Sequence, residues 1–294
     1  MDARLIEFGF SLLSTLRINN LFFSKKRSDV FNTNFIVLTY HQTTKKSFMD
    51  HIQYLDKKYV IIPFDDFYYQ FSKQNYPSDP TFIITFDDGR GSFYNEIFPV
   101  CEELSIPIMS YITTGHTMNM NPFWWDEVKE INNLGGTINT SLGFLTSGER
   151  RKIIDETGKK LYYVPKKGNV LSKEQIIELN KNKLISFGSH SVSHTNLTSE
   201  TEENIRYELK ESKKYLEELL HKEIVHFSYP NGYYNKCVIS ILKELGYKSS
   251  VTSADSWVSK TDDLFEISRI GAGPSGCSHH WLEVRISGIL KSLV

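Results

Sequence analysis

Short, wholly apolar segments alternate with longer amphipathic segments over most of the chain after residue 34. The apolar segments are continuous, which is typical of strands that are covered on both faces of a sheet. They lie at 35–40, 82–86, 108–113, 184–188, 225–229 and 247–252. The segments with helical spacing lie at 47–57, 94–104, 173–180, 202–221 and 236–245. This βαβα order predicts a parallel sheet with right-handed crossovers, and its length suits a barrel of the (β/α) kind.

Two segments interrupt this alternation. Residues 114–168 contain the run Asn121-Pro122-Phe123-Trp124-Trp125 and the pair Gly135-Gly136, and they predict an insertion on a loop that follows a strand. Residues 253–294 form a Gly-rich tail that ends in an apolar helix over 281–290. The helix at 202–221 is dense in Glu and Lys, a pattern typical of a solvated face.

Residues 1–33 predict a separate amphipathic helix and linker, so the folded domain is expected over 34–294. Apolar residues recur at helical spacing at Leu5, Phe8, Leu12 and Leu16. We favour a helix that packs on the domain, because an apolar stripe is typical of any surface helix. The alternative is that residues 1–27, with their basic end, contact a membrane surface. Charges interrupt the apolar run and the basic residues follow it, so we expect neither a signal peptide nor a membrane span.

Composition and charge exclude some classes of partner and favour one cellular compartment. The chain has 294 residues, of which 40% are hydrophobic and 23% charged, values typical of a soluble globular protein. A net charge of -1 provides no overall positive field, and we expect no nucleic-acid partner. Cys101, Cys237 and Cys277 are far apart and form no CxxC pair, which favours a reducing compartment and a cytoplasmic location, with the membrane periphery as an alternative.

Polar clusters follow directly on four of the predicted strands. They are His41, Asp87-Asp88-Gly89, the pair His190 and His194, and Pro230-Asn231-Gly232. The carboxyl ends of parallel strands open on one face of a barrel, where active sites collect. We therefore expect residues up to 190 positions apart to meet in one pocket.

The pattern His190-Ser-Val-Ser-His194 together with Asp88 predicts a metal site. Two imidazoles and one carboxylate suit Zn²⁺ and leave positions open for water and substrate, although Ni²⁺ or Co²⁺ also fit these ligands. Such a metal lowers the pKa of bound water to about 7. Asp87 is then free to accept a proton. The structural alternative is an ordinary Asp-Asp-Gly turn and two loop histidines, which would not explain why the clusters converge.

Three of these clusters resemble the motifs of a known family. Thr85-Phe86-Asp87-Asp88-Gly89 resembles the first motif of the NodB-type polysaccharide deacetylases, carbohydrate esterase family 4. Residues 189–194 resemble the second motif, and Phe227-Ser228-Tyr229-Pro230-Asn231-Gly232 the third. Leu38-Thr39-Tyr40-His41 and Ile267-Ser268-Arg269-Ile270-Gly271 are similar to one branch with a Tyr-His entry strand.

The resemblance implies a distorted (β/α)7 barrel that removes acetyl groups from N-acetylated sugars. It implies that Asp87 is the general base and that Asp88, His190 and His194 hold the metal. It also implies that the backbone N–H of Asn231 stabilises the oxyanion.

Two positions depart from the family pattern. Ser228 stands where many members carry an Arg that orients the base, and Arg269 is a candidate replacement. No clear copy of the Leu-x-His motif that supplies the general acid is present, so we assign that role to His41, as in the Tyr-His branch. The alternative for His41 is a hydrogen-bonded histidine that ends a strand. The further candidates for substrate binding are Trp124, Trp125, Tyr229, Pro230 and Arg269. For Trp124 and Trp125 the alternative is a place in the core or at an interface, the more common role of paired aromatic residues.

The sequence thus predicts a metal-dependent deacetylase that acts on a cell-surface polysaccharide or its lipid-linked precursor. One alternative is an esterase that removes O-acetyl groups from the same class of glycan. Another is a glycan-binding relative without turnover. The sequence does not distinguish these alternatives, because both hydrolyses pass through a similar tetrahedral intermediate.

Overall fold

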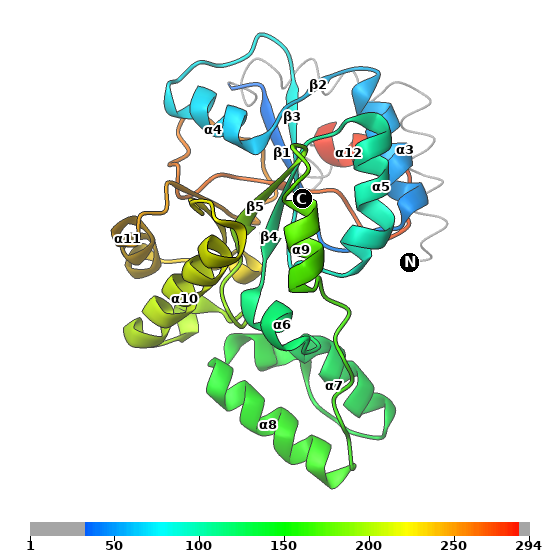
Figure 1. Ribbon diagram of the computed structural model, residues 1–294, viewed down its shortest axis with the longest axis vertical. Helices are drawn as coiled ribbons and strands as arrows, with labels where there is room; N and C mark the ends of the chain where they lie inside the picture. Colours follow the sequence, from blue (N-terminus) through cyan, green and yellow to red (C-terminus); the bar gives the residue numbers. More distant parts are fainter. Residues whose placement is uncertain (1–32, 288–294) are drawn as a thin grey trace.

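The fold is built on one curled parallel sheet, seen in a computed structural model that describes residues 33–287 (Figure 1). The strand order is β7-β6-β5-β4-β3-β1-β8, with β2 paired to β3, and all the pairings are parallel. The strands are β1 Phe35–Tyr40, β2 Val60–Ile61, β3 Thr81–Phe86, β4 Ile108–Ile112, β5 Ile185–Ser189, β6 His226–Ser228, β7 Ser249–Val251 and β8 Ile270–Gly271. The predicted α/β fold is confirmed in the form of a half-barrel.

Helices connect these strands and pack around the sheet (Figure 1). The helices are α3 Lys45–Asp56, α4 Phe64–Ser72, α5 Phe98–Leu104, α6 Thr114–Asn119, α7 Trp124–Asn133, α8 Ser147–Lys160, α9 Lys173–Leu179, α10 Glu202–Leu220, α11 Lys236–Glu244 and α12 His279–Ser287. Short helical turns are η1 Phe93–Ile97, η2 Thr140–Phe144, η3 Leu197–Ser199 and η4 Pro230–Gly232.

Both faces of the sheet are buried, as the continuous apolar strands predict. In β1, Ile36 and Leu38 belong to the larger apolar cluster, whereas Phe35 and Val37 belong to a second cluster with Phe64, Phe67 and Phe71 of α4. Successive side chains of a strand point to opposite faces, so a strand covered on both sides buries both sets of side chains. Helix α4 therefore covers the face opposite the larger cluster.

One short segment, residues 267–271, contacts both edge regions of the half-barrel. Strand β8 pairs with β1, and an isolated bridge joins Val251 of β7 to Ile267, three residues before β8. Arg269 lies between the bridge and β8, and it is fully buried. This segment thus carries a cation into the interior next to the carboxyl ends of the strands.

The segment 114–168 follows β4 and extends beyond the edge of the sheet (Figure 1). It contains α6, α7 and α8, and it has a small apolar cluster of its own that includes Val128, Ile131 and Ile154. Helix α8 begins with a capping box between Thr146 and Glu149, which fixes its first turn. The insertion therefore stands over the same edge of the sheet as the strand-end clusters.

Three hydrogen-bonded side chains, Asp65, His226 and Ser249, allow a prediction about the stability of the fold. The Nε2 of buried His226 lies 3.0 Å from Asp65 Oδ1, and its Nδ1 lies 2.8 Å from the Ser249 hydroxyl. The hydrogen bond to His226 lowers the pKa of Asp65 below its ordinary value of 3.8. A lowered folded-state pKa stabilises the fold above the unfolded pKa, and this stabilisation is lost as the pH falls through the folded value.

We expect Asp65→Asn to lower the free energy of unfolding by about 0.5 kcal/mol at pH 7, since Asp65 is exposed and screened. The difference from the parent should vanish in strong acid. Urea unfolding at pH 7, 5 and 3 measures this, and a difference that grows toward pH 3 would contradict the assignment.

The N-terminal helix and its membrane alternative fall on residues 1–32, outside the described residues, as does the end of the predicted helix at 281–290. Within residues 33–287, no helix combines the length and the apolar character that crossing a membrane requires.

Candidate functional site

The side chains of Asp88, His190 and His194 meet at the carboxyl edge of the sheet. Asp88 follows β3, and the two histidines lie in the loop that follows β5. The Asp88 Oδ1 lies 3.6 Å from His190 Nε2 and 3.4 Å from His194 Nε2. All three residues are buried, and within residues 33–287 they are the group of at least three His, Cys, Asp or Glu side chains that could hold a metal ion.

The spacing and the missing partners of these atoms fit a metal ion. Two ligands about 2.1 Å from one ion at a tetrahedral angle are about 3.4 Å apart. The Asp88 Oδ1 and His190 Nε2 atoms are buried and have no hydrogen-bond partner. Unpartnered buried polar atoms are costly unless something binds them. A divalent ion at this point would supply the missing interaction to both.

A neighbouring backbone group fixes the orientation of His190. Its Nδ1 lies 2.7 Å from the Ser228 carbonyl oxygen and therefore carries the proton, so that the Nε2 lone pair faces Asp88. Burial, only partly offset by the charge of Asp87, lowers the pKa of His190 to about 4. The imidazole is therefore neutral at neutral pH, which is the form that binds a metal.

Helix α10 fixes the loop between the two histidines through hydrogen bonds. The Glu208 carboxylate of this helix accepts hydrogen bonds from the backbone N–H groups of Val192 and Ser193 and from the Ser193 hydroxyl. The loop contains two residues with positive φ, Ser191 at 64° and His194 at 53°. Such conformations are uncommon for residues other than Gly, and they persist where surrounding contacts hold them. Glu208 fixes the two residues between them, and the Ser191 carbonyl oxygen accepts hydrogen bonds from the Ser212 hydroxyl and the Thr114 N–H. The His194 N–H donates to the Ser191 hydroxyl.

The Asp87 carboxylate is bound by a buried guanidinium. Arg269 Nη1 donates to Asp87 Oδ1 over 2.8 Å, and Arg269 Nη2 donates to Oδ2 over 2.7 Å. The Ser228 hydroxyl donates to Oδ2 over 3.1 Å. Burial alone would raise the pKa of Asp87, but the charge of Arg269 outweighs it and holds the pKa well below its ordinary value.

The guanidinium of Arg269 uses all five of its N–H groups. Besides Asp87 and the Ser228 hydroxyl, it donates to the Thr252 carbonyl oxygen and to the Thr85 hydroxyl. The side chain is fully buried. Arg269 is thus fully occupied with orienting Asp87 and its surroundings, and it presents no surface to a substrate in this structure.

His41 follows β1 beside Asp87, and Asn231 lies in η4, which follows β6. The His41 ring is half exposed, and its Nε2 lies 3.8 Å from Asp87 Oδ2. Asn231 is exposed and adopts a φ of 57°, a left-handed conformation that Asn tolerates better than most residues. Its backbone N–H has no acceptor among the described residues. Gly232 follows with a φ of 74°, and a Cβ there would lie 2.7 Å from the Ser253 Cβ.

The remaining candidates divide into two groups. Tyr229 and Pro230 are buried, and the Tyr229 hydroxyl donates to the Phe265 carbonyl oxygen, so a substrate would reach them only through the backbone. Trp124 and Trp125 are half-buried and nearly perpendicular to one another. The Trp125 ring centroid lies 4.7 Å from that of His194, whereas Trp124 lines a cavity beside the site.

Sequence reasoning missed the residues that link the insertion to the metal cluster. Arg90 Nε lies 3.8 Å from Asp88 Oδ2, and Arg90 Nη1 lies 2.6 Å from Asp126 Oδ2 in α7. The Arg90 guanidinium also covers the Phe123 ring at 4.3 Å. Arg90 directly follows the Asp87-Asp88-Gly89 cluster in the sequence, and this position could have indicated that it belongs to the site.

A curled parallel sheet with buried Asp, His and His side chains at its carboxyl edge defines a class of α/β proteins with a candidate metal centre. The family described as polysaccharide deacetylase matches residues 74–140 and 144–250. The matched segments span more than half of the chain, which therefore belongs to the polysaccharide deacetylase family.

Individual relatives are distant. YxkH of Bacillus subtilis (strain 168), provisionally named a polysaccharide deacetylase, is 22% identical over 247 residues, which are 81% of this chain and 71% of YxkH. The structure of the Streptococcus pyogenes deacetylase PplD in complex with acetate matches with a TM-score of 0.60 and 21% identity, over 81% of this chain and 91% of PplD. IcaB from Ammonifex degensii matches with a TM-score of 0.62 and 18% identity, over 86% of this chain and 96% of IcaB. At these identities the structural matches establish the fold alone.

Proposed function

We propose that this chain is a metal-dependent deacetylase that hydrolyses N-acetyl groups of a cell-surface polysaccharide or of its lipid-linked precursor. The observation that supports this most strongly is the buried cluster of Asp88, His190 and His194 beside Asp87, in a chain of the polysaccharide deacetylase family. Family membership implies an acetylated glycan as substrate.

We propose that Asp88 Oδ1, His190 Nε2 and His194 Nε2 hold a divalent ion. Zn²⁺ suits this ligand set best, and Ni²⁺ or Co²⁺ also fit it. When bound, the ion would act as a Lewis acid on the acetyl carbonyl and lower the pKa of a water molecule to about 7.

The chain's own residues would then move protons and stabilise charge. Asp87, kept ionised by Arg269, accepts a proton from the attacking water. The N–H of Asn231 donates to the carbonyl oxygen as negative charge develops there. His41, half exposed beside Asp87, donates a proton to the leaving amine. Acetate and a free amino sugar are the products.

Acetate release tests this proposal. The full chain, with its metal content quantified, is incubated with matched N-acetylated and O-acetylated oligosaccharides, and released acetate is measured. We expect release from the N-acetylated substrate, and we expect His41→Gln to lower kcat by a factor of about 10² to 10⁴ with unchanged metal content. The matched control is His279→Gln, a histidine that pairs with Asp50 on α3.

Preferential release from O-acetylated substrates would identify an esterase instead. Glycan binding without any acetate release from the metal-loaded protein would identify a binding relative. A His41→Gln variant with full activity would contradict the role of His41 and leave the deacetylase proposal intact.

A further inference from the structure

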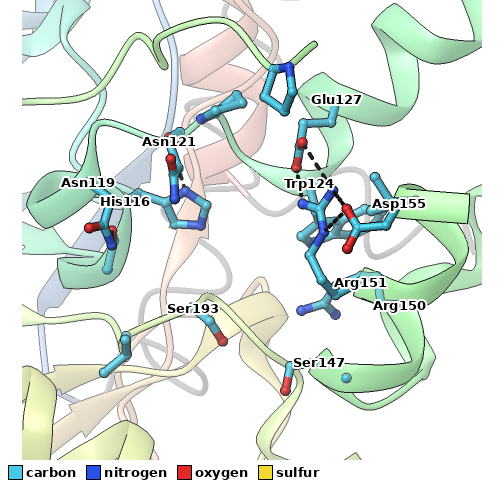
Figure 2. Close-up of a pocket in the computed structure, with 16 residues that line it drawn as sticks. His116, Asn119, Asn121, Trp124, Glu127, Ser147, Arg150, Arg151, Asp155 and Ser193 are labelled. Carbon is cyan, nitrogen blue, oxygen red and sulfur yellow. Dashed lines mark hydrogen bonds and ion pairs between the residues drawn. The ribbon is translucent and has the colours of Figure 1, made fainter. Parts of the chain in front are cut away.

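A cavity of about 570 Å³ lies beside the candidate metal centre, between the insertion and the loop that carries the two histidines (Figure 2). Residues of α6, α7 and α8 line it, together with Val192 and Ser193. These two residues lie between His190 and His194 in the chain. The cavity therefore shares a wall with the metal cluster, and its volume is within the range of small-molecule sites.

One side chain in this cavity has an unusual environment. Arg150, in the first turns of α8, is only 4% exposed, yet its guanidinium makes no hydrogen bond and no ion pair within residues 33–287. The guanidinium lies over the face of the Trp124 ring, with its Cζ 5.1 Å from the ring centroid. Figure 2 shows the Arg150 guanidinium pointing into the cavity, whereas the dashed interactions engage Arg151.

Arg269, the other buried arginine among the described residues, shows what a structural role for a buried guanidinium looks like. Arg269 is fully buried and satisfies all five N–H groups with protein acceptors. Arg151, next to Arg150, binds Glu127 and Asp155. The Arg150 nitrogens are not among the fully buried atoms that lack a partner, so they face the open space of the cavity. A cation held at a cavity wall with no carboxylate bound to it can accept an anionic partner from outside the chain.

The carboxylates around the cavity are already engaged by other donors. Arg151 binds Glu127 and Asp155, and Glu208 accepts from the 192–193 segment. Glu200 accepts from the Ser147 N–H, the Thr195 hydroxyl and the Asn204 amide. Burial, only partly offset by the charges of Glu200 and Glu208, lowers the pKa of Arg150. The ordinary pKa of arginine is so high that the guanidinium remains a cation at neutral pH. His116, which also lines the cavity, has a pKa lowered to about 4, chiefly by burial, and supplies no charge.

We propose that the cavity binds an anionic group, a carboxylate or a phosphate ester, carried by the glycan on a sugar near the one that is deacetylated. A planar guanidinium with all its N–H groups available matches the paired oxygens of such a group. The side chains of Trp124, Pro122 and Pro165 provide apolar surface for the sugar ring that carries it. This inference rests on the proposed function and refines it, since it assigns an acidic acetylated glycan as the substrate class.

Direct binding tests the site without requiring turnover. The full chain is titrated with D-glucuronate, with glucose 6-phosphate and with neutral D-glucose, by calorimetry and by tryptophan fluorescence, because Trp124 adjoins Arg150. We expect at least one acidic sugar to bind at least tenfold more tightly than glucose. The two acidic sugars decide between a carboxylate and a phosphate. Equal affinity for all three sugars, or no binding of either acidic sugar, would overturn the proposal.

Two variants assign the binding to Arg150. Arg150→Met keeps the length of the side chain and removes its charge, and Arg150→Gln keeps some hydrogen-bonding capacity. Both should weaken binding of the acidic sugar at least tenfold, while Arg206→Gln, on the exposed face of α10, should bind as the parent does. Since Arg150 makes no hydrogen bond or ion pair with the described residues and contacts only the Trp124 ring face, which Met can also cover, we expect the Tm of Arg150→Met to stay close to that of the parent. A clearly lower Tm with unchanged binding would make Arg150 a structural residue.

Acetate release then connects the site to the substrate class. The substrates are an N-acetylated oligosaccharide that carries uronic acids and the same oligosaccharide after chemical reduction of its carboxyl groups. We expect kcat/KM to be at least tenfold higher for the acidic form, and Arg150→Met to remove this preference. Binding of an acidic sugar without acetate release from any glycan would contradict the proposed function and keep the anion site. Equal kcat/KM for both substrates without anion binding would contradict the site and keep the function.

Discussion

The Asp88→Asn variant is expected to lose its divalent metal and, with it, at least about 10³-fold in kcat/KM for deacetylation. The change removes the anionic ligand while keeping the shape of the side chain. Asn also tolerates the φ of 73° that Asp88 adopts, whereas most residues do not. The fold should therefore survive the substitution, and the loss should report on the metal alone.

Metal content and thermal unfolding check this result independently of the substrate. The parent should gain stability when Zn²⁺ is added, by about 2.7 kcal/mol at 100 times the dissociation constant, because the ion binds only the folded state. Asp88→Asn should gain little at the same concentration. Asp50→Asn is the matched control. Asp50 lies in α3 and also pairs with a histidine, His279, but this pair is separate from the metal cluster. An Asp88→Asn variant that still carries its full metal content would mean that the ion binds elsewhere.

The strands and the metal cluster were predictable for the same physical reason. Apolar runs mark buried strands, and parallel strands bring their carboxyl ends to one edge, so residues that follow them must be neighbours. The predicted strands agree with the observed ones to within two residues at either end, and Asp88, His190 and His194 lie together. Helix α4 was missed, although Phe64, Phe67 and Phe71 recur at helical spacing. Strands β2 and β8 have only two residues each, too few for a sequence pattern, and only their pairing with β3 and β1 makes them strands.

The electrostatic environment of the site could not be read from the sequence. Arg150 and Arg151 are adjacent and chemically identical, yet Arg150 is buried against the Trp124 ring without an ion pair, whereas Arg151 binds two carboxylates. The difference arises from the packing of α8 on α7, which periodicity does not specify. Similarly, Arg269 was a candidate for two roles, and only its five buried hydrogen bonds show which group it serves. Sequence patterns locate a charge on an element, whereas its partner depends on the tertiary contacts of that element.

The Arg269→Met variant is expected to lower the free energy of unfolding by about 3–5 kcal/mol, because it leaves the Asp87 carboxylate buried without its cation. It should also raise the pKa of Asp87, since the charge of Arg269 holds that pKa down. The acidic limb of the pH profile of kcat/KM should therefore shift to higher pH. Urea unfolding in excess chelator measures the stability change without a contribution from metal binding.

A double-mutant cycle separates the ion pair from the loss of packing. Asp87→Asn alone leaves Arg269 without a counter-charge, and the combined Asp87→Asn and Arg269→Met variant leaves neither charge unpaired. The combined variant should therefore be more stable than the sum of the two single effects predicts, because contacting charges are not additive. Arg269→Lys should restore part of the stability and move the pH profile back toward that of the parent, although one ammonium cannot replace a bidentate fork. Strictly additive effects, with a pH profile unchanged in every Arg269 variant, would show that the guanidinium fills space without acting on Asp87.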